Sequence, residues 1–156
     1  MEIKTIGVIG AGAMGSGIAH VCALADHDVI LVDIERARAD AALIIIGGNM
    51  ERQVRRALIT QDEMDAGLAR ISVGDGYPAL ADCEVVIEAA SENEVVKKAI
   101  YAELTETLKA EAIICSNTSS IPITRLAATT DRPEKFMGMH FMNPVPVMKL
   151  VELIRG

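Results

Sequence analysis

The sequence has few aromatic residues and no tryptophan. Phe, Trp and Tyr make up 3% of its 156 residues, so the stacking platforms of single-strand nucleic-acid binders are missing. Basic residues are also in the minority: 15 Lys and Arg stand against 22 Asp and Glu, which gives a net charge of −7. Since a phosphate backbone requires a basic surface, we expect no nucleic-acid partner.

Cysteine is scarce as well. The three cysteines, Cys22, Cys83 and Cys115, are widely spaced and form no Cys-x-x-Cys pair. This number and spacing argue against a zinc site and a disulfide framework. We therefore expect three buried thiols, no metal site, and a reducing, cytoplasmic compartment.

Charged side chains are absent from residues 5–25, a run long enough to span a bilayer. Repeated glycines and a histidine interrupt this run, however. The residues before it are not clearly positive, as those of a signal peptide would be, because they include Glu2 as well as Lys4. A strand, a turn and a buried helix explain the run better, so we expect no membrane segment.

The composition and patterning indicate one α/β domain. A hydrophobic fraction of 51% with a charged fraction of 24% excludes disorder. Short apolar runs alternate with helical patterns, and the early runs are continuously apolar, which is typical of parallel strands covered on both faces. The expected strands are residues 3–9, 29–34, 71–74, 85–89, 112–115, 136–141 and 148–154.

The interval between the second and third expected strands is long enough for two helices. Ala41, Ile45 and Val54 have partial helical spacing, although two glycines weaken the middle of the first helix. The sequence TQDE at 60–63 is a capping box that begins the second helix at Gln61. A later helix is expected to face the sheet with the row Val96, Ile100, Leu104 and Leu108.

A glycine-rich turn follows the first expected strand and fits G-x-G-x-x-G. Its members include Gly10, Gly12, Ala13, Met14 and Gly15. Such glycines permit a tight turn, close approach of a pyrophosphate, and packing of the next helix, whose N-terminus binds the anion. Asp33 ends the second strand about twenty residues later, as in dinucleotide sites, where it would bind ribose hydroxyls and repel a 2′-phosphate.

The motif therefore predicts a Rossmann-type, doubly wound sheet that binds NAD rather than NADP. Arg36 lies near Asp33 and leaves the choice between the two cofactors partly open. A turn that only packs a helix on a strand, or a methyltransferase site, are the alternatives to a dinucleotide site.

Among the three histidines, His140 has a catalytic setting. His20, in the helix after the glycine turn, is expected to be structural, and His27, before the second strand, to be exposed. The proline-rich segment after His140 should reverse the chain into an antiparallel edge and bring Glu152 near it. That carboxylate would hold one ring N–H and leave the other nitrogen as a base for an alcohol dehydrogenase, although spacing alone leaves a core histidine equally open.

The loop SNTSS at residues 116–120 follows the fifth expected strand. Ligands bind outside the carboxyl ends of strands in open α/β sheets, so its hydroxyls are placed to hold a substrate oxygen. A turn and helix cap before Pro122 is the alternative.

Together these motifs resemble the 3-hydroxyacyl-CoA dehydrogenase family, which includes bacterial 3-hydroxybutyryl-CoA dehydrogenases. The resemblance covers the whole chain and rests on GVIGAGAMGSGIAHVCA, VDI, VIEAASENEVVKK, SNTSSIPIT and GMHFMNPVPVMKLVELI, in that order. It implies the reversible, NAD-dependent oxidation of 3-hydroxyacyl-CoA to 3-oxoacyl-CoA, a step of fatty-acid β-oxidation.

The resemblance also implies roles for individual residues. The catalytic residues would be His140 as base, Glu152 as its orienting carboxylate, and Ser119. The cofactor would be bound by Gly10, Gly12, Ala13, Met14, Gly15, Asp33, Glu92, Lys97, Ser119 and Asn143. The acyl-CoA substrate would be bound by Ser119, Asn49 and Arg56, where family members often have Ser and Lys at the last two positions. Arg52, Arg55 and Arg56 are equally compatible with a solvated helix face.

Family members continue into a helical dimerisation domain that is absent from this sequence. We therefore expect residues 1–156 to form the NAD-binding domain, and the full-length protein to be a homo-oligomer. An apolar face around Phe141, Met142 and Val147 is expected to be exposed and to cause self-association. Two alternatives to the dehydrogenase are an NAD-binding module that is inactive without a separate helical domain, and a related β-hydroxyacid dehydrogenase.

Overall fold

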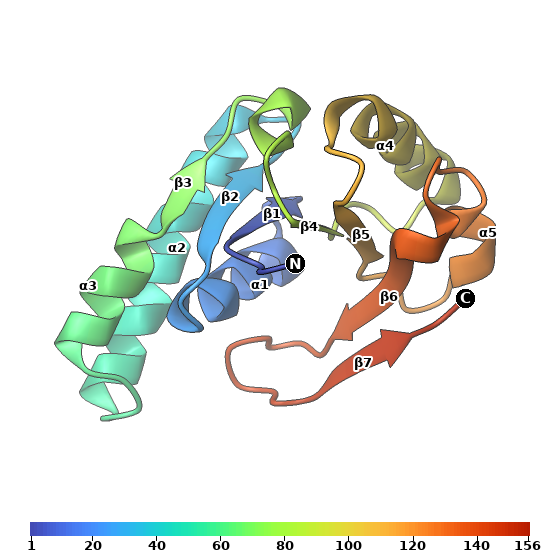
Figure 1. Ribbon diagram of the computed structural model, residues 1–156. Helices are drawn as coiled ribbons and strands as arrows, with labels where there is room; N and C mark the ends of the chain where they lie inside the picture. Colours follow the sequence, from blue (N-terminus) through green and yellow to red (C-terminus); the bar gives the residue numbers. More distant parts are fainter.

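The computed structural model describes residues 1–156 and contains one seven-stranded sheet (Figure 1). The strands are β1 (Thr5–Ile9), β2 (Asp28–Val32), β3 (Ile71–Val73), β4 (Val85–Glu88), β5 (Ile113–Ser116), β6 (Phe136–Phe141) and β7 (Val151–Ile154). They are ordered β3-β2-β1-β4-β5-β6-β7. All neighbouring pairs are parallel except β6 and β7, which are antiparallel. The predicted Rossmann-type sheet with an antiparallel edge is confirmed, and its strand order reverses between β1 and β4.

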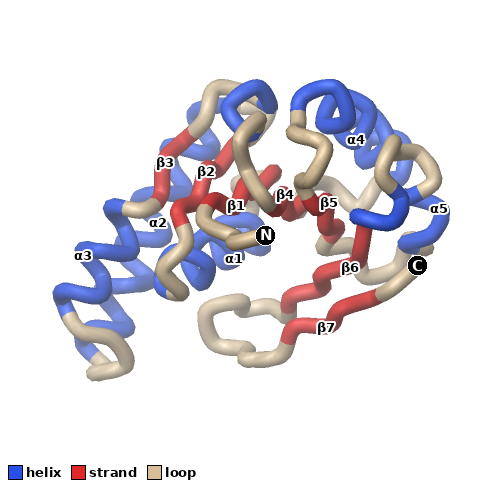
Figure 2. The backbone as a smooth tube through the Cα atoms, in the orientation of Figure 1, coloured by secondary structure: helices blue, strands red, loops and turns tan.

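Helices cover both faces of the sheet (Figure 2). They are α1 (Ala13–Leu24), α2 (Arg36–Arg55), α3 (Gln61–Ala69), α4 (Glu94–Thr107) and α5 (Ile123–Ala127), with the 3-10 turns η1 (Tyr77–Leu80) and η2 (Pro133–Lys135). The first three helices pack in one hydrophobic cluster, and α4 and α5 contribute to a second. The uncharged run at 5–25 folds as β1, the turn and α1, and none of the helices has the length and hydrophobicity to cross a membrane.

The two helices between β2 and β3 are confirmed, and α3 begins at Gln61 as predicted. Thr60 and Glu63 form the capping box: Thr60 Oγ1 accepts from the Glu63 N–H at 3.1 Å, and Glu63 Oε2 accepts from the Thr60 N–H at 2.7 Å. The partial helical spacing of Ala41 and Ile45 does not mark the buried face of α2, since both residues are exposed. The buried residues of α2 are Ala39, Ala42, Ile46 and Met50. The run contains two apolar rows, and packing against the neighbouring elements selects one of them.

Two expected exposures are also corrected. Val96, placed in the sheet-facing row of α4, is 41% exposed because it lies in the first turn of the helix, beside a cavity, while Ile100, Leu104 and Leu108 are buried as predicted. Phe141 is buried rather than exposed, because it packs in the hydrophobic cluster that also contains the buried residues of α1. Val147 is exposed as predicted, and the apolar surface at this edge also includes Met148, Leu150 and Leu153.

His20 on α1 is fully buried and contacts α2. Its Nε2 lies 2.7 Å from Gln53 Oε1, and its Nδ1 has no hydrogen-bond partner. Burial lowers the pKa of this imidazole, and the hydrogen bond to Gln53 offsets only part of that effect.

His20→Gln is expected to make the free energy of unfolding less dependent on pH below neutrality. The imidazole binds a proton less readily in the folded chain, so unfolding takes up a proton below pH 6.5 or so. As the pH falls below this value, the free energy of unfolding decreases by up to about 1.4 kcal/mol per pH unit until the folded-state pKa is reached. Above pH 7 this histidine does not change the free energy of unfolding with pH. Urea titrations at pH 7 and pH 5 measure this. Wild type should lose more stability than the variant between the two, and equal losses would count against the explanation.

Candidate functional site

The turn between β1 and α1 accepts only glycine at two positions. Gly10 has a φ of 100°, and a Cβ there would lie 2.5 Å from the carbonyl oxygen of Ala89. A Cβ on Gly15 would lie 1.6 Å from the carbonyl oxygen of Gly10. Both glycines therefore keep the turn tight against the end of β4 and the start of α1.

The N-terminus of α1 is open for an anion. Gly12 is its N-cap and supplies no side-chain cap, and the first turn contains no acidic residue. The amides of Gly12, Ala13 and Met14 donate to no acceptor within the protein. Free N–H groups at the positive end of a helix dipole fit the pyrophosphate of a dinucleotide.

Asp33 lies directly after β2 and is joined to this turn. Its Oδ2 accepts from the Ala11 N–H at 2.8 Å, and its Oδ1 accepts from the Glu35 N–H at 2.9 Å. Each oxygen keeps a lone pair with which to accept from a ribose hydroxyl. The Arg36 guanidinium is engaged by Asp75 at 3.1 Å and Asp40 at 3.4 Å, so it offers no free charge to a 2′-phosphate.

A cavity of about 630 Å³ lies at the carboxyl ends of β1, β2 and β4, where the strand order reverses. Its lining includes Gly12, Ala13, Met14, Asp33 and Ala90. Such a volume is typical of a small-molecule site, and the position is that of nucleotide sites in doubly wound sheets. The residues present therefore fit the adenosine and pyrophosphate of NAD.

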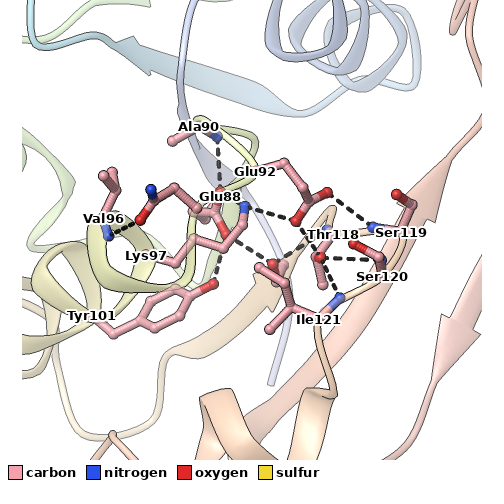
Figure 3. A network of polar contacts seen from close by, with 12 residues as sticks. Glu88, Ala90, Glu92, Val96, Lys97, Tyr101, Thr118, Ser119, Ser120 and Ile121 are labelled. Carbon is pink, nitrogen blue, oxygen red and sulfur yellow. Dashed lines mark hydrogen bonds and ion pairs between the residues drawn. The ribbon is translucent and has the colours of Figure 1, made fainter.

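Beside this cavity, the buried carboxylate of Glu88 gathers four donors at the end of β4 (Figure 3). Glu88 Oε2 accepts from Lys97 Nζ at 2.6 Å and from the Ala90 N–H at 2.8 Å. Glu88 Oε1 accepts from the Tyr101 hydroxyl at 2.6 Å and from Ser116 Oγ at 2.8 Å. Burial, and then the nearby Glu88 carboxylate, raises the pKa of Tyr101. One carboxylate thus holds together the ends of β4 and β5 and the first turns of α4.

Glu92 connects the loops that follow β4 and β5 (Figure 3). Its Oε1 accepts from Thr118 Oγ1 at 2.5 Å, and its Oε2 accepts from the Ser119 N–H at 3.2 Å. Burial raises the pKa of Glu92, but these hydrogen bonds and the charge of Lys97 outweigh it, so the pKa lies below its ordinary value. Lys97 itself is 1% exposed and turned onto Glu88, and its predicted contact with the cofactor stays a prediction.

His140 and Glu152 lie directly opposite each other on β6 and β7. His140 Nδ1 is 3.0 Å from Glu152 Oε2, and the other ring nitrogen has no protein partner. Opposed residues of an antiparallel pair point to the same side of the sheet, which explains the contact. A carboxylate on Nδ1–H fixes the tautomer and leaves Nε2 as an acceptor for a proton.

The hydroxyl-rich loop reaches β6 through Asn117. Its Oδ1 accepts from the Phe141 N–H at 2.8 Å, which brings the segment that contains Ser119 to the end of β6 next to His140. Ser119 and Asn143 are exposed. The Asn143 side chain makes no hydrogen bond within the protein, and the Ser119 side chain lies beside Glu92, whose pKa it helps to lower. None of His140, Glu152, Ser119 and Asn143 lines the 630 Å³ cavity.

A second groove, of about 550 Å³, lies between α2 and the loop before β7. It contains Asn49 and Arg56, together with Arg52 and Lys149, and no carboxylate lines it. Arg55 turns away and pairs with Glu51 at 3.6 Å. In a chain of net charge −7, this groove is a concentration of positive charge.

Sequence reasoning missed several residues of these sites. Glu88 is an acidic residue at the end of an otherwise apolar strand, and that position alone was the available signal. Tyr101 carries no signal, since its role depends on contact with Glu88. Ser116 was expected in the hydroxyl-rich loop that holds a substrate oxygen, but it ends β5, is buried and donates to Glu88. Lys149 joins the groove only because the chain reverses after β6.

A doubly wound sheet with this glycine turn, an acid at the end of β2 and a His–Glu pair at the far edge defines the nucleotide-binding domain of an NAD-dependent dehydrogenase. Residues 5–156 match the family described as "3-hydroxyacyl-CoA dehydrogenase, NAD binding domain". The chain belongs to this family.

Known relatives agree with this membership. The chain is 56% identical to a 3-hydroxybutyryl-CoA dehydrogenase of Bradyrhizobium diazoefficiens, over 99% of this chain and 53% of that protein. It is 42% identical to the 3-hydroxyadipyl-CoA dehydrogenase of Escherichia coli, over 100% of this chain and 33% of that protein. The crystal structure of (S)-3-hydroxybutyryl-CoA dehydrogenase from Ralstonia eutropha has a TM-score of 0.96 and 44% identity, over 99% of this chain and 55% of that one. The chain thus spans about half the length of the 3-hydroxybutyryl-CoA dehydrogenases that it matches.

Proposed function

We propose that the chain forms the NAD-binding half of an enzyme that reversibly oxidises a 3-hydroxyacyl-CoA to a 3-oxoacyl-CoA. The observation that supports this most is the His140–Glu152 pair, which lies at the carboxyl end of β6, on the same side of the sheet as the glycine turn after β1. β1, β4, β5 and β6 are parallel, so their carboxyl ends lie along one edge. A dinucleotide seated at β1 extends along that edge toward β6.

The residues divide the chemistry as follows. Glu152 accepts from Nδ1–H of His140 and stabilises the imidazolium that forms. His140 Nε2 takes the proton of the substrate hydroxyl as the carbinol C–H bond breaks. Bound NAD supplies the hydride acceptor. Ser119 Oγ, exposed beside Glu92, hydrogen-bonds the substrate oxygen and holds it near His140.

The groove formed by Asn49, Arg52, Arg56 and Lys149 is the proposed site for the phosphates of the CoA moiety. Guanidinium groups bind phosphate through paired hydrogen bonds, and no carboxylate competes for them in this groove. This feature favours a CoA thioester over a free β-hydroxyacid, which carries no phosphate.

Arg56→Ala is expected to raise KM for the CoA substrate about tenfold with little change in kcat. It removes a phosphate contact remote from the reacting atoms, worth about 1.5 kcal/mol for an exposed charged hydrogen bond. Arg55→Ala is the matched control, because Arg55 pairs with Glu51 outside the groove. Steady-state kinetics of both variants measure the effect, and equal KM increases would contradict the proposed site.

The function itself is tested by NADH oxidation with acetoacetyl-CoA, followed by absorbance. The chain is assayed alone and mixed with the remaining half of the Bradyrhizobium relative. Turnover by the chain alone would make it an enzyme in its own right. Turnover only in the mixture would show that the active site needs the second half. Turnover in neither case, with NADH still bound, would overturn the proposed reaction and leave an NAD-binding module.

Two further proposals concern the setting of the enzyme. Cys22, Cys83 and Cys115 are buried and unpaired, and burial raises their pKa values to about 11, 11 and 12. Such unreactive thiols support a reducing, cytoplasmic location. The apolar surface at Val147, Leu150 and Leu153 supports a homo-oligomeric full-length protein.

A further inference from the structure

Arg38, on the first turn of α2, lies over the glycine turn. Its Nη2 is 4.0 Å from the position that a Cβ on Gly12 would occupy, and its side chain lines the 630 Å³ cavity with Asp33. Arg38 is exposed, and its guanidinium makes no ion pair or hydrogen bond with the protein. A full positive charge therefore stands free beside the amides that face the pyrophosphate.

The other charged residues around the cavity are acidic, so Arg38 is the one side chain there that can attract an anion. Asp33, Glu103 and Arg38 are its charged lining residues, so two carboxylates surround a site for a doubly charged pyrophosphate. Arg38 is the single cation among them. Without it, the positive end of α1 would attract the anion against an unfavourable side-chain field.

Arg36, two residues earlier on α2, provides an internal comparison. Its guanidinium is held by Asp75 and Asp40, and it does not line the cavity. Two arginines on the same helix turn therefore differ in partner and placement, and one of them is free to serve a ligand.

We propose that Arg38 is a cofactor-binding residue whose guanidinium contacts the pyrophosphate of the dinucleotide opposite the N-terminus of α1. This proposal rests on NAD binding by the chain. The contact serves NADH and NADPH alike, because the pyrophosphate is common to both. The proposal also predicts that the affinity for ADP depends on Arg38 and that the affinity for adenosine, which has no phosphate, does not.

The test compares Arg38→Gln with Arg36→Gln by ligand binding rather than turnover. NADH and NADPH dissociation constants are measured by nucleotide fluorescence, and ADP and adenosine by competition with NADH. For Arg38→Gln we expect the Kd values of NADH and ADP to rise about tenfold, and that of NADPH to rise equally where NADPH binds. The Kd of adenosine and the midpoint of unfolding should not change. Arg36→Gln should leave NADH binding within about twofold, and the Arg38 effect should shrink at high salt.

Other outcomes overturn the contact. An equal loss of NADH affinity in both variants would show that the effect of Arg38 is one of general surface charge rather than of a contact. A loss confined to NADPH would place Arg38 at a 2′-phosphate instead, and no change would remove it from the site. Failure of the wild-type chain to bind NADH would overturn the cofactor site itself, a result distinct from NADH binding that is insensitive to Arg38.

Discussion

His140→Gln is expected to lower kcat for acetoacetyl-CoA reduction by about 10²- to 10⁴-fold, which is the usual contribution of a positioned general acid or base. The physical reason is the opposed pairing of β6 and β7. Glu152 accepts from Nδ1 at 3.0 Å and leaves Nε2 as the proton-transferring atom, for which a glutamine amide offers no substitute. The rate is measured by NADH absorbance in the preparation that shows turnover, with NADH affinity measured in parallel.

The variants that accompany it define the role. Glu152→Gln should lower kcat by a smaller factor, since the base remains but its tautomer and imidazolium lose support. His27→Gln is the matched control, because this histidine is far along the chain and hydrogen-bonds only the carbonyl of Ile3. If His140→Gln retained more than a tenth of wild-type kcat, His140 would not be the base.

Glu88→Gln is expected to lower the free energy of unfolding by about 3–5 kcal/mol, because it removes the carboxylate 2.6 Å from the buried Lys97 ammonium and leaves only Glu92, at 4.0 Å, as a counter-charge. Glu88 is fully buried and the Lys97 side chain is 2% exposed, so water does not replace the lost partner. Such a loss is a large part of the stability of an ordinary domain, about 5–15 kcal/mol. Urea titration measures it.

The matched control is Lys98→Met, on the same helix. Lys98 pairs with Glu94 at 3.0 Å on the surface, and its loss should cost less than 1 kcal/mol or so. The double variant Glu88→Gln with Lys97→Met should be more stable than Glu88→Gln alone, since it also removes the buried charge that has lost its nearest partner. A double variant no more stable than Glu88→Gln alone, or a Glu88→Gln variant no worse than Lys98→Met, would show that the pair is not coupled.

Local patterns were sufficient for most of the fold. The strands, the capping box at Thr60 and the glycine turn depend on neighbours within a few residues, so they can be predicted from the sequence. The spacing of Ala41 and Ile45 indicated the helix α2 but not its buried face, because they belong to one of two apolar rows and tertiary packing selected the other. Phe141 was misplaced for the same reason: burial is a property of the assembled layers.

For the site, the sequence by itself determined the residue types: a glycine turn, an acid after β2, a histidine, and a glutamate one chain reversal later. Only the tertiary structure decided their partners. The register of β6 and β7 sets His140 against Glu152, and the buried Glu88 accepts hydrogen bonds from Lys97 and Tyr101 of α4 and from Ser116 of β5. Arg36 and Arg38 look alike in the chain, yet one is held by aspartates and the other stands beside Gly12. Charges and hydrogen bonds act over a few ångströms, and which groups come that close is set by the folded chain rather than by spacing along it.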